Sequence, residues 1–175
     1  MNRSLEQFWA LRALIQGGGL ARVADDAARV GEIIRRFGLA SESTSYADAL
    51  KALRNLVPER VDQDDAGLAT PFDLDDEEAQ LLAFAALRTS ALLQIATDTL
   101  GVLTRQQSFG AVATIVGLPD KIVATTLSPA RRLIRGDFIR LAPDALAILR
   151  HRFRLGSAVA IELAAVRQVE HRSRA

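Results

Sequence analysis

The only two histidines of the chain are its best candidates for metal binding or general-base chemistry. His151 and His171 stand twenty positions apart, and each has an arginine beside it. A zinc site or a general base would need carboxylates from elsewhere in the chain, and a neighbouring guanidinium disfavours a bound cation. We therefore expect both histidines to be surface residues with no catalytic or metal-binding role.

Three further groups have residue types that can do chemistry but lack the required spacing. The glycines at 17–19 have no preceding strand and no following Lys-Ser/Thr, so a helix end is favoured over a phosphate loop. Asp62, Asp64 and Asp65 lack the glycine and distal glutamate of a calcium loop. No serine stands in a G-x-S-x-G motif. The sequence thus predicts no catalytic residue, no cofactor and no metal, and a chain that is not itself an enzyme.

The composition is that of a globular protein with an ordinary core. The chain has 175 residues, of which 49% are hydrophobic and 25% charged, and it has no cysteine. The absence of cysteine excludes disulfides and thiolate chemistry and fits a reducing compartment. The longest apolar run, Leu81 to Leu87, is far too short to span a bilayer, and the N-terminus has no continuous apolar segment of a signal peptide. These features predict a soluble, cytoplasmic protein with no membrane partner.

Charge is distributed unevenly along the chain. Residues 1–99 carry 10 Lys and Arg against 16 Asp and Glu, a net charge of −6, whereas residues 100–175 carry 12 against 5, or +7. The basic half could bind nucleic acid, or the two halves could attract one another within the fold or across a dimer. The second interpretation is favoured, because 11 of the 12 basic residues are arginines and several stand beside apolar positions.

The hydrophobic periodicity is helical through most of the first half. It predicts a helix that Ser4 caps and the glycines at 17–19 end, a second helix over residues 20–37, and a third from Ser45 to Pro58. Trp9, beside Phe8 on the first amphipathic helix, is favoured as a core residue over a partner anchor. We expect residues 1–57 to form an N-terminal helical segment.

Residues 58–72 are predicted to be an acidic linker, since they combine two prolines and a glycine without periodicity. After the linker, Asp75 and Glu78 have the spacing of a capping box. The leucine-rich stretch from Leu81 to Leu100 then predicts one long helix or two broken helices.

The stretch 109–127 has the spacing of a helix-turn-helix. Ala113 is a small residue for close helix contact, Gly117 supplies the turn, and Val123 packs the second helix back. Leu133, Gly136 and the following DFIRL predict a short third helix, a glycine stop and a β-strand. The sequence thus predicts a winged-helix-like domain with a minimal β-wing over residues 73–142.

The remaining residues, 143–175, are expected to form C-terminal helices. The last of these should begin near Ser157, with Val159, Leu163 and Val166 facing inward. That helix could pair with a second copy of the chain or pack on its own domain, and the pattern does not separate these alternatives.

A proline shortens the predicted recognition helix. Ser128 precedes Pro129, a pair that ends the helix near Leu127 and lets Ser128 cap a new one. The outward side carries no arginine, asparagine or glutamine for bidentate base contacts, and Asp120 would repel phosphate. Base-specific DNA recognition is therefore disfavoured. The residues expected to contact a partner, or phosphates without reading sequence, are Lys121, Thr125, Arg131, Arg132, Arg135 and Arg140.

The segments LDDEEAQLLAFAAL and VATIVGLPDKIVATTLSPARRLIRGDFIRL resemble the region preceding the ATPase core in some bacterial AAA ATPases. The resemblance covers about residues 72–142 and depends on apolar spacing together with Gly117, Leu127, Ser128, Leu133 and Gly136. The chain has no G-x-x-x-x-G-K-[ST] motif, no Walker-B-like strand and no arginine-finger context. The resemblance implies that this chain is the non-catalytic, N-terminal part of such a protein.

These observations predict an all-α protein composed of a helical bundle segment and a winged-helix-like domain. The favoured function is an adaptor that binds a protein partner or substrate and presents it to an attached ATPase. The alternative is a DNA-binding winged-helix regulator acting as a dimer. Both functions are compatible with a homo-oligomer. A standalone enzyme is the least favoured.

Overall fold

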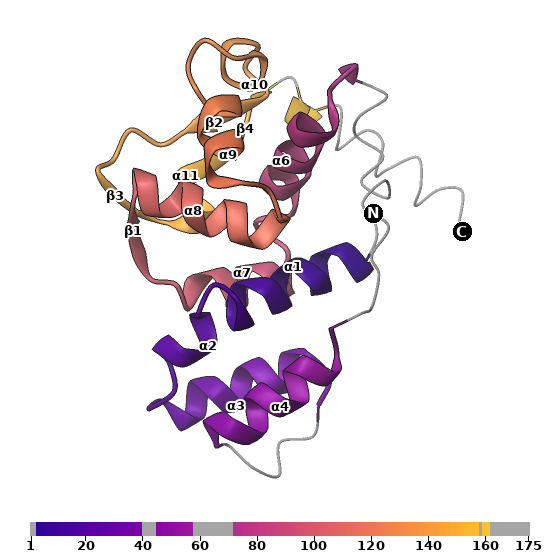
Figure 1. Ribbon diagram of the computed structural model, residues 1–175, viewed down its shortest axis with the longest axis vertical. Helices are drawn as coiled ribbons and strands as arrows, with labels where there is room; N and C mark the ends of the chain where they lie inside the picture. The colour runs from indigo at the N-terminus through magenta and orange to yellow at the C-terminus, as the bar shows by residue number, and fades with distance from the viewer. Residues whose placement is uncertain (1–2, 40–44, 58–71, 158, 162–175) are drawn as a thin grey trace.

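The computed structural model describes residues 3–39, 45–57, 72–157 and 159–161 (Figure 1). These residues form mostly helices, with two small antiparallel sheets in which β1 pairs with β3 and β2 with β4. The predicted linker, except for Phe72, lies outside the described residues, as do the linker aspartates, His171 and most of the predicted last helix. No single described helix is long and apolar enough to cross a membrane.

The helices are α1 (Arg3–Ile15), α2 (Gly19–Arg22), α3 (Ala27–Arg36), α4 (Tyr46–Asn55), α6 (Asp76–Leu87), α7 (Ala91–Asp98), α8 (Arg105–Val116), α9 (Asp120–Thr126), α10 (Arg132–Arg135) and α11 (Leu149–Arg152). The strands are β1 (Val102–Thr104), β2 (Ile139–Leu141), β3 (Leu146–Ile148) and β4 (Phe153–Leu155). A mostly helical fold is confirmed.

Local capping signals correctly located several helix ends. The Ser45 hydroxyl accepts a hydrogen bond from the Asp48 amide at 3.2 Å and begins α4. Asp75 and Glu78 form the predicted capping box of α6, with the Glu78 amide 2.7 Å from the Asp75 carboxylate. Gly117 ends α8 with φ +89°, a left-handed conformation that favours glycine.

The prediction of one helix over residues 20–37 is wrong, because the chain forms α2 and α3 there. Asp26 separates the two helices: its carboxylate accepts a hydrogen bond from the Arg29 amide at 3.0 Å and caps α3. An aspartate competes well for this position because it satisfies an amide that a helix start leaves unpaired. Ser4 was also misplaced, since α1 already includes it.

Gly136 follows α10 as its C-cap residue, and β2 begins three residues later, so the predicted short helix, glycine stop and strand are confirmed. Two other predictions after residue 127 need correction. Ser128 does not cap the next helix: its carbonyl closes a turn with the Arg131 amide at 3.0 Å, and α10 begins only at Arg132. Residues 143–155, predicted to be helical, contain β3, α11 and β4.

The N-terminal helix α1 is part of the core of the described chain. It packs against α7 and α8, and in Figure 1 it runs between the α3–α4 pair and the elements from α8 to α10. Trp9 is 1% exposed, as predicted for a core residue, and its ring lies 6.2 Å from that of Phe84. Phe84 contacts Phe153 edge to face at 5.8 Å. Aromatic contacts therefore connect α1 through α6 to β4.

Glu6 joins α1 to the beginning of α7. Its carboxylate accepts a hydrogen bond from the Leu92 amide at 2.9 Å, in the first turn of α7. Ser90, the N-cap residue of α7, makes no capping bond with its own side chain. A carboxylate at this place satisfies an unpaired amide and interacts favourably with the positive end of the helix dipole.

Replacing Glu6 with alanine should therefore reduce the free energy of unfolding by about 1 kcal/mol, as loss of a helix cap typically does. Urea unfolding followed by the fluorescence of Trp9, the single tryptophan, measures the change. Glu32→Ala is the control, because the exposed Glu32–Arg36 pair is 3.9 Å apart and should contribute less than about 0.5 kcal/mol. Equal losses in the two variants would contradict a capping role.

Candidate interaction surface

The surface around α9 and α10 is built by two short helices and the turn between them. α8 and α9 enclose a bend of 114°, and the three residues Gly117, Leu118 and Pro119 connect them. α9 has seven residues and ends at Thr126, so the predicted break before Pro129 is confirmed. We define the α9–α10 surface by the exposed residues Lys121, Ile122, Thr125, Arg131 and Arg135.

All six residues predicted to contact a partner are exposed, but two of them have intramolecular partners. Arg132 donates to the backbone carbonyls of Asp73 and Phe72 at 2.5 and 2.7 Å. Arg140 donates both sides of its guanidinium to the Asp137 carboxylate at 2.5 Å. Arg132 is thus bound to backbone carbonyls and Arg140 to a carboxylate of the same chain. These contacts reduce the positive charge available to a ligand.

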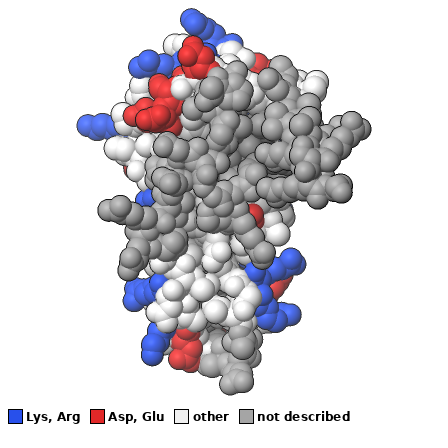
Figure 2. Space-filling view, turned by 90° about the vertical axis from the view of Figure 1, so that its right-hand side faces the viewer, with Lys and Arg blue, Asp and Glu red and all other residues white. Residues whose placement is uncertain are grey.

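Among the described residues, two ion pairs connect the acidic and basic halves of the sequence. Arg132 lies 3.8 Å from the Asp73 carboxylate, and Arg150 lies 2.5 Å from that of Asp98. On the face drawn in Figure 2, basic and acidic side chains lie beside one another at both ends of the molecule rather than in separate halves. The charge asymmetry of the sequence is therefore used at least partly for contacts within the fold.

The paired Arg140 changes the acidity of Asp137. Its hydrogen bond is the main cause that holds the pKa of Asp137 below the ordinary value, and its charge acts in the same direction. A carboxyl whose pKa is lower in the folded than in the unfolded state stabilises the fold above the unfolded pKa, about 3.9 for aspartate. That contribution is lost as the pH falls through the lower folded pKa.

An Asp137→Asn variant tests this linkage, because asparagine tolerates positive φ but carries no charge. Its urea midpoint should lie below that of the wild type at neutral pH, and the difference should shrink towards zero as the pH falls through the lowered folded pKa of Asp137. The urea midpoint of an Arg140→Gln variant should approach that of the wild type over the same pH range. A difference that is constant down to pH 2 would show that the ion pair is not its source.

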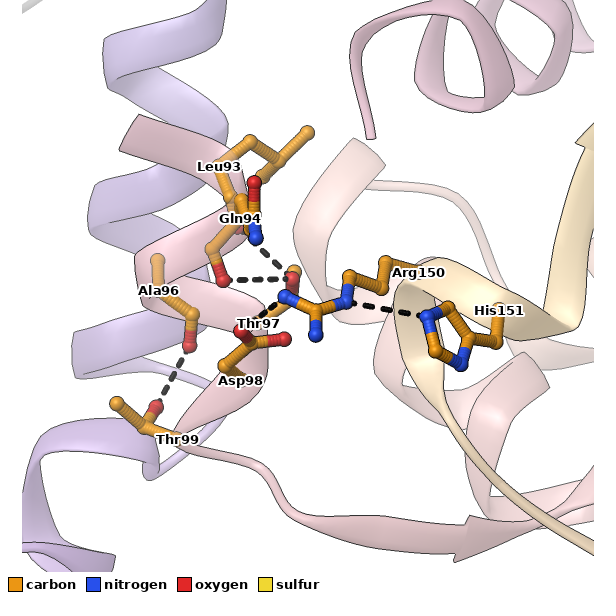
Figure 3. Close-up of polar contacts among 8 residues, drawn as sticks. All are labelled: Leu93, Gln94, Ala96, Thr97, Asp98, Thr99, Arg150 and His151. Atoms are coloured by element: carbon orange, nitrogen blue, oxygen red, sulfur yellow. Dashed lines mark hydrogen bonds and ion pairs between the residues drawn. The ribbon is translucent and has the colours of Figure 1, made fainter. Parts of the chain in front are cut away.

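Asp98, Arg150 and His151 lie together where α7 meets α11 (Figure 3). Arg150 donates to Asp98 at 2.5 Å and, through Nε, to His151 Nε2 at 3.4 Å. His151 is exposed, as predicted, and its ring faces a guanidinium, which disfavours a bound cation. In the described part of the chain, no three His, Asp or Glu residues are placed to hold a metal. This cluster fastens α11 to α7.

Arg152 is a buried residue that the sequence analysis missed. It is 0% exposed, and its guanidinium donates to the carbonyls of Leu103, Ala142, Asp144 and Ala145. These carbonyls belong to β1 and to the segment between β2 and β3. The alternation of arginine with apolar residues around α11 gave a weak signal for burial, but nothing identified this arginine among its neighbours.

The α9–α10 surface thus presents cations next to an exposed apolar side chain. Lys121, Arg131 and Arg135 make no ion pair with any described residue. Ile122, directly after Lys121 on α9, is 38% exposed. No protein-family model, no curated protein and no solved structure matches the chain.

Proposed function

We propose that this chain is a non-catalytic recognition domain that binds a protein partner on the α9–α10 surface. The observation that carries the proposal is the short, interrupted shape of that surface, beside which Arg132 and Arg140 are occupied by internal contacts. The remaining cations and Ile122 suit an acidic segment with an apolar residue. Interfaces commonly combine an apolar centre with a charged rim.

The geometry of α8 and α9 supports a recognition role without favouring base-specific DNA binding. The 114° bend between α8 and α9 lies within the range usual for helix-turn-helix units, and the β2–β4 ladder follows. However, seven residues of helix extend only about 10 Å, and Asp120 occupies the first position of α9. A helix of this length with an acidic start is poorly suited to the major groove.

The resemblance to the region before an AAA ATPase core extends the proposal. In that arrangement the domain holds a partner or substrate while a following ATPase core acts on it. Binding a partner on the α9–α10 surface requires shape and charge complementarity but no nucleotide. This agrees with a sequence that has no nucleotide-binding motif.

A photoactivated cross-linking residue at Thr125 of the full-length protein, irradiated in cells, tests the proposal. Thr125 lies on the exposed side of α9, and Ala47, exposed on α4, is the matched control position. We expect a protein adduct from position 125 that is absent at position 47. Adducts that nuclease removes, or equal patterns from both positions, would refute the proposal.

Weak binding of duplex DNA at low salt is expected from the three unpaired cations. Fluorescence polarisation of a labelled duplex at two salt concentrations should show binding that disappears at physiological ionic strength. Binding that persists there would favour the DNA-binding alternative instead.

A further inference from the structure

Residues of α3 and α7 line a cavity of about 640 Å³. In Figure 1, α3 and α10 lie towards opposite ends of the molecule. The volume of the cavity is within the range of small-molecule sites, about 300–1,000 Å³. We propose that this cavity binds a small organic anion that carries an apolar body. This activity is separate from partner binding on the α9–α10 surface and uses none of its residues.

The two walls of the cavity are single faces of the two helices. α3 contributes Ala28, Glu32 and Arg35, and α7 contributes Ala91, Ile95 and Asp98, in each case over two helical turns. The opposite face of α3 is buried through Val30, Ile33 and Ile34, and that of α7 through Leu93, Ala96 and Thr97. The core contacts therefore hold both helices in place without using the faces that line the cavity.

Small side chains keep the space between the walls open. Ala28 and Ala91 line it, where longer residues would fill the gap. The arrangement is set by the packing of α3 and α7 on the core, so the cavity does not depend on a ligand to form.

The acidic residues of the cavity are already engaged. Asp26 caps α3 through the Arg29 amide, Asp98 binds Arg150, and Glu32 lies 3.9 Å from Arg36. Arg150 and Arg36 offset two of these three negative charges, and Asp98 Oδ1 is buried without a hydrogen-bond partner.

The cations that remain are Arg29 and Arg35. Among the described residues, the Arg29 guanidinium has no hydrogen-bond partner, and Arg35 donates only from Nε, to the Gly31 carbonyl at 3.3 Å. Both guanidinium groups therefore have terminal N–H donors available, which suit a carboxylate, sulfonate or phosphate group.

The α7 wall supplies the complementary apolar and polar contacts. Ile95 and Gln94 are partly exposed on this wall, so an apolar body can pack on Ile95 while the Gln94 amide bonds to a polar substituent. The arginines of the α3 wall and the apolar surface of the α7 wall together suit a ligand that has an anionic group and an apolar body.

Two related probes separate the charge from the apolar body. 8-Anilinonaphthalene-1-sulfonate carries the anion, and N-phenyl-1-naphthylamine has the same rings without it. In an Arg29→Gln/Arg35→Gln variant, the affinity for the anionic probe should fall about tenfold, and that for the neutral probe should change less than about twofold. The matched control is Lys51→Gln/Arg54→Gln, which removes two exposed cations from α4 and should leave both affinities unchanged.

Amide chemical-shift changes on titration of the wild type locate the bound probe. We expect these changes to be concentrated in α3 and α7. An Ile95→Gln substitution should weaken the binding of both probes without removing the preference for the anionic one. Hexyl phosphate and hexanoate, as competitors, identify the preferred anionic group, and displacement by either supports the proposal. Shifts elsewhere, no saturable binding, or an unchanged affinity in the arginine variant would overturn it.

Discussion

A Gly156→Ala variant is expected to lose about 3 kcal/mol of folding free energy, because the new methyl group has no space. Gly156 is buried directly after β4, and its amide donates to the Phe138 carbonyl at 2.9 Å. An added Cβ would overlap the backbone carbonyl oxygen of Asp137. A backbone atom cannot rotate away as a side chain can, so the β2–β4 ladder would have to open at this end.

Thermal unfolding followed by circular dichroism measures this effect, and the midpoint should fall by roughly 6–12 °C for a chain of this size. Gly38→Ala is the matched control. Gly38 has φ +76° but no atom within 4 Å of an added Cβ, so only backbone strain of about 1 kcal/mol is expected. Equal unfolding midpoints for the two alanine variants would contradict the predicted overlap at Gly156.

Replacing Arg152 with methionine should cost about 3 kcal/mol, since the buried carbonyls that it satisfies would lose their donors. The methionine side chain fills much of the same space but donates no hydrogen bond. The guanidinium joins β1 to the segment between β2 and β3, so amide protons of the β1–β3 pair should exchange faster than in the wild type.

Two comparison variants make the Arg152 result specific. Arg154→Met changes an exposed arginine two positions along the chain and should shift the free energy of unfolding by no more than about 0.5 kcal/mol. Arg152→Lys keeps the charge and three donors but lacks the planar fork, so its loss should be intermediate. A methionine variant at 152 that is as stable as the one at 154 would show that the carbonyl contacts are not stabilising.

Most helix ends could be predicted because their causes lie within a few residues. Ser45 and Asp75 each cap a helix through an amide three positions later, and Gly117 turns the chain by its own φ. Pro129 prevents α9 from continuing, which sequence alone showed correctly. The break at Asp26 was missed because the apolar spacing of residues 20–37 continues across it, and Ser128 closes a turn instead of capping the helix that follows.

The candidate surface could be predicted only as a set of exposed residues. Sequence identified Lys121, Thr125 and the arginines, but it could not show that Arg132 reaches the carbonyls of Phe72 and Asp73. It also gave no sign of the cavity between α3 and α7, since the two walls stand about sixty positions apart in the chain. What the α9–α10 surface and the cavity can bind depends on which side chains have no partner within the folded chain.

The sequence by itself determined the helical character, the positions of most breaks, and the absence of recognised catalytic motifs, because these depend on neighbouring residues. Only the tertiary structure decided that Glu6 caps a helix 86 positions away and that Arg152 is buried among backbone carbonyls. Capping and turn preferences act through hydrogen bonds between near neighbours in the chain. Contacts between distant residues exist only once the apolar faces have packed together, so their partners are set by the arrangement of the whole core.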